Sequence, residues 1–215
     1  MIGPDTAVLS LQNGVDNEAK IDAILGPGHA LGGAAYVFAT IEAPGVIVHR
    51  FAGRIVFGEL DGVTRPRTER MLDAFGRAGV PAEASTDIAR ILWEKYLMIC
   101  AQAGMTSLTR CPIGVIRDTP ATWRMYRAIV EELAGVGRAA GVRLSSDVVD
   151  RIVKAAAALA PEAYSSLYHD LVHGKRLELE ALQGHAVRLG ERLGVPTPML
   201  AAVYAALSPH TAGRR

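Results

Sequence analysis

Residues 88–114, IARILWEKYLMICAQAGMTSLTRCPIG, constrain the fold more than any other stretch, because they form an almost wholly apolar run with helical spacing. Such a run predicts a helix inside a core. One lysine, Lys95, interrupts it. Burial without a partner disfavours the charged form of an ammonium group, so Lys95 either extends along apolar surface with its charge in water or is kept for proton chemistry.

The sequence before residue 86 mixes strands and helices. Short apolar runs ended by Gly, Pro or Asn predict strands, and spacings of three and four predict helices. The first predicted strand begins near residue 6 and is expected to be buried on both faces. A strand buried in this way needs neighbours on both sides, so this segment resembles the distal part of an α/β domain. The expected strands are 6–11, 30–39, 45–49, 54–57 and 81–84, and the expected helices are 16–25 and 65–78.

From residue 86 onward the pattern indicates helices alone. Thr86 or Asp87 is expected to cap the helix that carries Lys95, and Thr119 followed by Pro120 begins the next one. Short connections between six helices predict a compact helical domain. The expected helices after the first are 120–140, 145–160, 164–172, 177–193 and 198–207. The domain boundary is therefore expected between residues 85 and 86.

Composition excludes several classes of protein. Of 215 residues, 50% are hydrophobic, and 23 basic side chains balance 22 acidic ones. This balance gives no electrostatic footprint for nucleic acid or an anionic membrane, so the expected partners are small molecules or copies of the chain, as in a homodimer. Cys100 and Cys111 lack companions at metal-ligand spacing, which indicates buried thiols and no metal site. Without a signal peptide or a membrane-spanning stretch, the expected location is cytoplasmic.

Residues 135–140, GVGRAA, match the loose dinucleotide fingerprint G-x-G-x-x-G/A. That fingerprint binds pyrophosphate only where its glycines follow a strand and open a helix. Here they follow a helical pattern and lie near its end. We therefore expect these glycines to serve close helix packing.

Several motifs taken together resemble the ketopantoate reductase family, also called 2-dehydropantoate 2-reductase. They follow the family's order over nearly the whole chain: 9–15 (LSLQNGV), 93–95 (WEK), 106–110 (TSLTR), 165–170 (SSLYHD), Glu178 and 194–198 (GVPTP). The resemblance implies an N-terminal Rossmann-like domain that holds NADPH, of which residues 1–85 are the distal, incomplete part. It also implies that residues 86–215 form a substrate-binding and dimerisation domain of the type found at the C-terminus of 6-phosphogluconate dehydrogenase.

The resemblance also implies a reaction and its residues. A 2-oxo acid, 2-dehydropantoate, is reduced to pantoate, a precursor of pantothenate and coenzyme A. Lys95 matches the family's catalytic lysine, which gives a proton to the keto oxygen, and Glu178 matches the acid that holds the substrate hydroxyl. Ser166 matches a substrate-binding serine, and Asn13 matches the asparagine beside the nicotinamide and the lysine, which implies that it binds both substrate and cofactor.

Each of these residues also has a structural interpretation. Asn13 and Gly14 form an ordinary turn pair, Ser165 and Ser166 can cap a helix, and Glu178 suits the first turn of a helix. Two further pairs of polar residues are expected on the surface rather than in a site: His169 with Asp170, and Glu131 with Glu132.

Two departures from the family pattern matter. Many members carry asparagines four and eight residues after the lysine, where this chain has Ile99 and Ala103, so another 2-oxo acid is an alternative substrate. The glycine-rich turn of the first Rossmann strand is also missing from the sequence, which therefore either starts late or belongs to a truncated relative. The alternatives are a non-catalytic dimerisation or binding module and a related dehydrogenase for hydroxy acids or opines.

Overall fold

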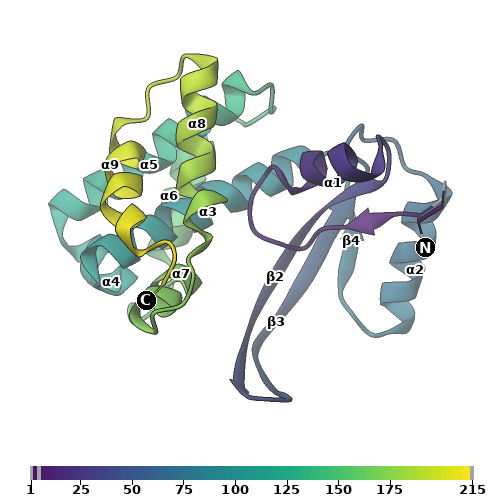
Figure 1. Cartoon of the computed structure of the whole chain (residues 1–215), viewed down its shortest axis with the longest axis horizontal. Helices are drawn as coiled ribbons and strands as arrows, with labels where there is room; N and C mark the ends of the chain where they lie inside the picture. The colour runs from purple at the N-terminus through teal and green to yellow at the C-terminus, as the bar shows by residue number, and fades with distance from the viewer. Residues whose placement is uncertain (1, 4–5, 214–215) are drawn as a thin grey trace. The chain divides into compact units, whose positions relative to one another are not determined.

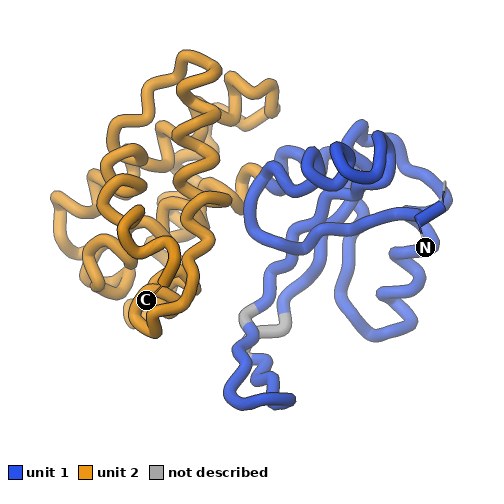
Figure 2. The backbone as a smooth tube through the Cα atoms, viewed as in Figure 1, with its two compact units in different colours: residues 1–92 blue, residues 93–215 orange. Residues whose placement is uncertain are grey.

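The computed structural model describes residues 2–3 and 6–213, apart from the side chains of residues 38 and 50–52. The chain divides into two compact units, residues 1–92 and 93–215 (Figure 2). This division falls between Leu92 and Trp93, inside helix α3 (Ile88–Thr109). The expected domain boundary lies just upstream of that helix. The α/β segment followed by a helical segment that the sequence predicts is confirmed.

The first unit is built on a mixed sheet of four strands in the order β1-β2-β3-β4 (Figure 1). The two outer pairings, β1 with β2 and β3 with β4, are parallel, whereas β2 and β3 are antiparallel. Two helices, α1 and α2, belong to the same unit. The bounds are β1 (Val8–Leu9), α1 (Asn17–Leu25), β2 (Ala30–Ala43), β3 (Val46–Gly58), α2 (Pro66–Arg77) and β4 (Ala82–Ala84).

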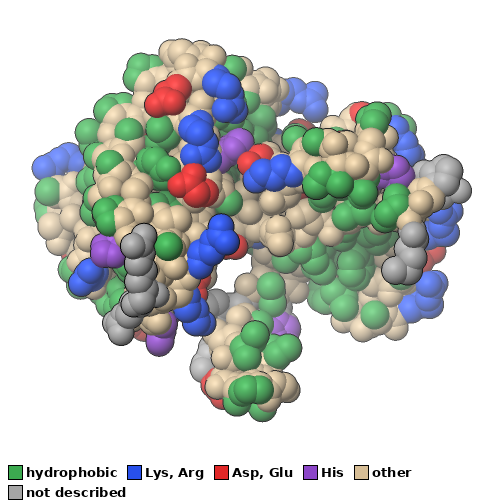
Figure 3. Space-filling model, in the orientation of Figure 1, with side chains coloured by type: hydrophobic (Ala, Val, Ile, Leu, Met, Phe, Trp, Pro, Cys, Tyr) green, Lys and Arg blue, Asp and Glu red, His purple; other side chains and the backbone are tan. Residues whose placement is uncertain are grey.

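Strands β2 and β3 form one long hairpin, which corrects the prediction of three separate strands. Its turn is Pro44-Gly45, with Gly45 at φ +78°, the combination that favours a tight turn. Ala52 and Gly53, expected to separate two strands, lie inside β3 at a register shift. A bulge absorbs the extra residue, so the glycine bends the strand without ending it. Ile41 and Ile47 are exposed near the turn, where Figure 3 shows hydrophobic side chains at the surface.

Strand β1 is shorter and less buried than the sequence predicts. The expected strand covers residues 6–11, but only Val8 and Leu9 pair, with Ala30 and Leu31 of β2, and both are half-buried. Within the described sheet β1 has a neighbour along one edge only, which explains its incomplete burial. The predicted helices and the last strand are confirmed with small shifts at their ends, and Gly79, at φ +67°, follows the end of α2 as expected.

The first turns of α3 pack against this sheet. Ile88 and Leu92 form a buried cluster with Ala34 and Val56. A Cβ placed on Gly32 would lie 2.9 Å from Cγ1 of Ile88, so the absence of a side chain there lets helix and strand approach closely. The apolar run that begins at residue 88 therefore contributes its start to the first unit and the remainder to the second.

The second unit surrounds the rest of α3 with helices (Figure 1). Its core includes Leu97, Cys100 and Met105 of α3, all fully buried. Gly137, inside α5, would place a Cβ 2.7 Å from the Trp93 ring, which confirms close packing as the role of the fingerprint-like glycines. The remaining bounds are α4 (Ile113–Asp118), α5 (Pro120–Ala139), α6 (Val148–Ala157), α7 (Ser166–Val172), η1 (Glu178–Glu180), α8 (Gln183–Leu193), α9 (Pro198–Leu207) and η2 (Ser208–His210).

Two details of this unit differ from the prediction. The six-helix expectation omits α4, which forms immediately after Pro112 and packs Ile113 and Ile116 into the core. The predicted helix 177–193 is divided into the 3-10 turn η1 and helix α8, because Leu182 leaves helical geometry at ψ −98°. No helix within the described residues has both the length and the apolar character needed to cross a membrane.

Candidate active site

Lys95 lies on α3 and is half-buried. Burial lowers the pKa of its ammonium group below 10.5, while the nearby charge of Glu178 raises it. The desolvation effect is the larger of the two, so the lysine keeps a lowered pKa although a carboxylate acts on it. The fold therefore brings together two residues that the sequence separates by most of the helical unit.

Buried side chains and backbone hydrogen bonds hold the chain on either side of Glu178. Leu177 and Leu179 are buried, whereas Glu178 between them is exposed. The Leu177 N–H donates to the Thr211 carbonyl at 3.0 Å, and the Leu182 N–H donates to the Glu178 carbonyl at 3.1 Å. Anchored apolar neighbours thus hold the Glu178 backbone in a tight turn while leaving its side chain at the surface.

Two buried polar contacts attach this turn to α3. Tyr96, next to Lys95, donates its hydroxyl to the Leu182 carbonyl at 2.5 Å. Gln183 donates its amide Nε2 to the Cys100 carbonyl at 2.8 Å. Both residues position Glu178 relative to Lys95, and sequence analysis missed them. The sequence feature that could have indicated them is a polar side chain among apolar residues, because a buried polar group must find a hydrogen-bond partner.

Ser166 is the first residue of α7 and is exposed. Its neighbour Ser165 is the helix cap, because its hydroxyl accepts from the Tyr168 N–H at 3.1 Å. The same hydroxyl lies 2.7 Å from that of Thr106, which attaches α7 to α3. The capping interpretation thus holds for Ser165 and leaves the Ser166 side chain available. The substrate-binding role of Ser166 stays a prediction.

Asn13 lies in the first unit, in the turn between β1 and α1. Its carbonyl accepts from the Asn17 side chain at 3.1 Å, and Gly14 has φ +115°. The residue therefore serves the turn through its backbone. Its place beside the nicotinamide and the substrate stays a prediction.

The two positions where the family asparagines are replaced differ in burial. Ile99 is half-buried, and Ala103 is only 3% exposed. Both follow Lys95 by whole helical turns, so they belong to its face of α3. Neither side chain can donate a hydrogen bond, so at these two positions the face of α3 that carries Lys95 is apolar.

Of the two polar pairs that the sequence places on the surface, one residue, Glu132, has a structural role that was not expected. His169 is exposed and Asp170 half-buried. Glu131 pairs with Arg127 at 3.5 Å on the outside of α5. Glu132 differs from the prediction, since its carboxylate accepts from the Met199 and Leu200 N–H groups, both at 2.9 Å, and so caps the start of α9. A carboxylate from another helix replaces the missing side-chain cap.

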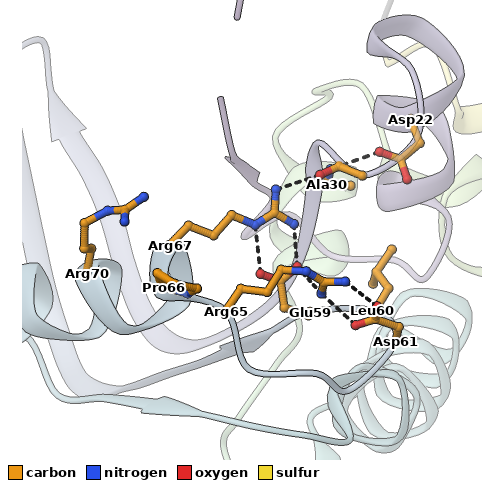
Figure 4. Close-up of a pocket in the computed structure, with 10 residues that line it drawn as sticks. Asp22, Ala30, Glu59, Leu60, Asp61, Arg65, Pro66, Arg67 and Arg70 are labelled. Carbon is orange, nitrogen blue, oxygen red and sulfur yellow. Dashed lines mark hydrogen bonds and ion pairs between the residues drawn. The ribbon is translucent and has the colours of Figure 1, made fainter. Parts of the chain in front are cut away.

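The first unit contains a charged cluster of its own, which lines a cavity of about 550 Å³ (Figure 4). Glu59, 3% exposed, accepts from Arg67 Nε at 2.8 Å and from the Thr68 hydroxyl at 2.9 Å, and Arg67 Nη2 contacts its other oxygen. Arg65 pairs with Asp61 at 2.6 Å and with Glu59 at 3.2 Å. The acids and these two arginines neutralise one another, so the cluster serves the fold.

The described residues contain no group of three or more His, Cys, Asp or Glu side chains that could hold a metal ion. Cys100 and Cys111 are both free. Burial raises the pKa of the Cys100 thiol well above its usual range, which keeps it protonated and unreactive.

Two family models match the chain. The model described as "Ketopantoate reductase PanE/ApbA C terminal" matches residues 87–211, and "Ketopantoate reductase PanE/ApbA" matches residues 1–62. A curated relative, the 2-dehydropantoate 2-reductase of Caulobacter vibrioides, is 30% identical over 208 residues, which make up 97% of this chain and 69% of the relative. The matched proteins are oxidoreductases. This chain belongs to the ketopantoate reductase family.

Solved structures agree with this assignment. The crystal structure of a PanE/ApbA family ketopantoate reductase from Ralstonia eutropha JMP134 has a TM-score of 0.88 and 30% identity, covering 98% of this chain and 68% of that one. D-mandelate dehydrogenase in complex with NADH has a TM-score of 0.87, covering 97% of this chain and 71% of that one. At 22% identity the latter comparison shows the fold alone. The chain thus spans about 70% of the length of these proteins.

Proposed function

We propose that this chain carries the catalytic and substrate-binding part of an NADPH-dependent reductase of a 2-oxo acid, with 2-dehydropantoate as the first candidate substrate. The observation that carries this proposal is the pair formed by Lys95 and Glu178, in which burial lowers the pKa of the lysine while the carboxylate acts on it. Perturbed groups of this kind are typical of catalytic sites.

In this proposal Lys95 is the general acid. When NADPH is bound, it supplies a hydride to the carbonyl carbon of the substrate. Negative charge then develops on the keto oxygen, and the Lys95 ammonium stabilises that charge and transfers its proton to the oxygen. The lowered pKa makes the proton easier to give at neutral pH. Glu178, exposed beside it, accepts a hydrogen bond from a substrate hydroxyl, and Ser166 holds another polar group of the substrate.

In this proposal the described residues supply a candidate for one end of the cofactor, the nicotinamide end. The turn after β1 holds Asn13 and Gly14; the latter's φ of +115° suits glycine, whose lack of a side chain permits a close approach to the backbone. The sequence match to the phosphate-binding fingerprint lies inside α5, where it packs helices. We therefore assign Asn13 to the nicotinamide end and assign no described residue to the pyrophosphate.

The apolar face of α3 favours a second candidate substrate. Ile99 and Ala103 provide no amide donors on the Lys95 side of the helix. A site that lacks such donors loses the hydrogen bonds that favour a polar substrate over an apolar one. We therefore infer that a 2-oxo acid with an apolar side chain is the alternative to 2-dehydropantoate.

The test measures NADPH oxidation by two proteins, the 215-residue chain and an extended chain in which the upstream segment of the Caulobacter vibrioides relative precedes residue 1. Circular dichroism first establishes that the extended chain is folded. We expect it to oxidise NADPH with 2-dehydropantoate or with an apolar 2-oxo acid such as 2-oxoisovalerate. The ratio of the two kcat/KM values identifies the substrate class, and Ile99→Asn should shift that ratio toward 2-dehydropantoate.

Two outcomes would contradict the proposal. A folded extended chain that binds NADPH but reduces no 2-oxo acid would favour a non-catalytic binding module. Equal rates for the extended chain and its Lys95→Met variant would show that another group gives the proton. The homodimer expected from the sequence is tested separately, by light scattering of the chain as it elutes from a sizing column.

A further inference from the structure

A second cavity lies entirely within the helical unit, with a volume of about 390 Å³. Three basic residues line it: Arg110, which follows α3, Lys175, in the loop before η1, and His210, in η2. The rest of its lining is apolar or glycine, and none of its described lining residues is acidic. We call this cavity the basic pocket.

Among the described residues, no acidic side chain lines the basic pocket to balance its basic groups. Within the described part of the chain, Arg110, Lys175 and His210 form no ion pair and no side-chain hydrogen bond. The arginines of the first unit show the contrast, because Arg65 and Arg67 both pair with acids. Basic groups that converge without a counter-charge repel one another, and an anion between them removes that repulsion.

Arg110 gives a second, independent indication. It has φ +57°, and it is the non-glycine residue with positive φ in the described chain. This position directly follows α3, where glycine is the residue that ends a helix without strain. A long basic side chain in a conformation that favours glycine points to a use for that side chain.

The backbone around the basic pocket is held by contacts between distant segments. The end of the described chain lies beside α7 (Figure 1), and a Cβ placed on Gly213 would lie 2.6 Å from the Gly174 carbonyl. Lys175 donates its N–H to the Asp170 carbonyl at 2.8 Å, and Leu177 donates to Thr211 at 3.0 Å. The two segments that carry Lys175 and His210 are thus joined before any ligand binds.

The basic pocket is separate from the candidate active site. Arg110 follows Lys95 by fifteen residues along α3, a distance of about 22 Å at the helical rise of about 1.5 Å per residue. Lys175 belongs to the loop that leads into Glu178, three residues later. The Arg110 end of the pocket therefore lies away from Lys95, and its Lys175 end belongs to the segment that leads into Glu178.

We propose that the basic pocket binds a phosphate group, either as free phosphate or as a phosphate monoester. A doubly charged oxyanion matches a guanidinium, an ammonium and an imidazole better than a single carboxylate does, because it offers more acceptor oxygens and more charge. Arg110 supplies parallel N–H donors, and Lys175 supplies a compact charge.

Isothermal titration calorimetry of the 215-residue chain tests this proposal with two probes, inorganic phosphate and glycerol phosphate, at constant ionic strength. We expect saturable binding of at least one probe at concentrations up to about 10 mM. Tighter binding of inorganic phosphate identifies the free ion as the ligand, and tighter binding of glycerol phosphate identifies a monoester.

Variants place the binding in the basic pocket. Arg110→Gly removes the side chain and suits the backbone at φ +57°, so the protein should stay folded while affinity falls about tenfold or more. Lys175→Gln should have a similar effect. Lys154→Gln, which removes an exposed charge from α6, is the matched control and should leave affinity unchanged. The proposal is overturned if neither probe binds saturably, or if Arg110→Gly binds phosphate as tightly as the unaltered chain.

Discussion

Arg67 in the first unit and Lys95 in the second are both cations that lie partly out of water, and their surroundings act on them in opposite directions. Hydrogen bonds to Glu59 raise the pKa of Arg67, whose side chain is 19% exposed. Burial lowers the pKa of Lys95, and the charge of Glu178 does not fully compensate for it. One cation is stabilised in its charged form by the fold, and the other is destabilised.

This difference separates a structural ion pair from the lysine that we propose as the general acid. A cation held by two bonds to a buried carboxylate contributes to stability, and its loss leaves the charge of Glu59 less fully compensated. A cation whose charged form is disfavoured contributes nothing to stability by that charge, but it can give up a proton readily. Four predictions test this comparison.

The largest expected effect is on catalysis by the extended chain. Lys95→Met should lower kcat by about 10²- to 10⁴-fold, the usual contribution of a general acid. The same change should leave the stability of the 215-residue chain unaltered or increase it, because it removes a charge that the fold disfavours. Steady-state NADPH oxidation and thermal unfolding measure the two effects.

Lys95→Arg is the companion variant, since it keeps the positive charge but cannot give a proton near neutral pH. A rate close to that of the unaltered protein would mean that charge alone is needed there. A large loss of stability in Lys95→Met would instead place Lys95 with the structural cations.

Arg67→Met should destabilise the first unit by about 2 to 3 kcal/mol, because Glu59 stays buried with only Thr68 and Arg65 to hold it. Urea unfolding followed by circular dichroism measures this change. Fluorescence of Trp93 and Trp123, which both belong to the second unit, provides a reference transition. Arg70→Met is the matched control, since Arg70 lines the same cavity from α2 and is exposed, and it should change stability by less than about 0.5 kcal/mol.

Glu178→Gln should move the alkaline limb of the kcat profile to lower pH. The carboxylate raises the pKa of Lys95, and the lysine must be protonated to act as an acid, so removal of that charge makes the rate fall earlier as pH rises. Glu180→Gln is the control in the same 3-10 turn, because Glu180 bonds to Arg188 and Tyr204, each at 2.7 Å. An equal shift in both variants would rule out a specific action of Glu178 on Lys95.

The smallest effect concerns the pH dependence of stability. The folded state lowers the pKa of Glu59 below 4.5, chiefly through Arg67, so the pair's contribution is present above that pH and is lost as pH falls through the folded pKa. The folded state also lowers the pKa of Lys95 below 10.5. Between the folded pKa and 10.5 the folded state therefore binds fewer protons than the unfolded state, and stability rises with pH over that range.

Comparison of variants separates the acid loss of stability due to Glu59 from the alkaline rise of stability due to Lys95. The stability deficit of Arg67→Met should shrink on acidification, and the alkaline rise should disappear in Lys95→Met. Urea unfolding at a series of pH values measures both. An alkaline rise that survives in Lys95→Met would belong to another group.

The sequence predicts most helices because their signals are local. Helix α9 begins at Pro198 and ends at Leu207 as expected, since proline starts it and its apolar residues repeat at helical spacing. The sequence pattern divides the long hairpin wrongly, because glycine usually interrupts a strand. In the structure, β3 pairs with β2 on both sides of Gly53, so the strand continues through it. Helix α4 was missed because six residues give too short a pattern, and packing of Ile113 and Ile116 makes it a helix.

For the candidate site, the sequence is enough to identify Lys95 and Glu178 as candidates, because Lys95 interrupts an apolar helix and Glu178 matches a residue of the family pattern. That these two residues act on each other depends on the folded chain, because Tyr96 and Gln183 bond to backbone far along the sequence and so attach the Glu178 turn to α3. The basic pocket was likewise invisible in the sequence. Arg110, Lys175 and His210 belong to three separate segments, and charge without a counter-charge becomes apparent only when folding brings such groups to one cavity.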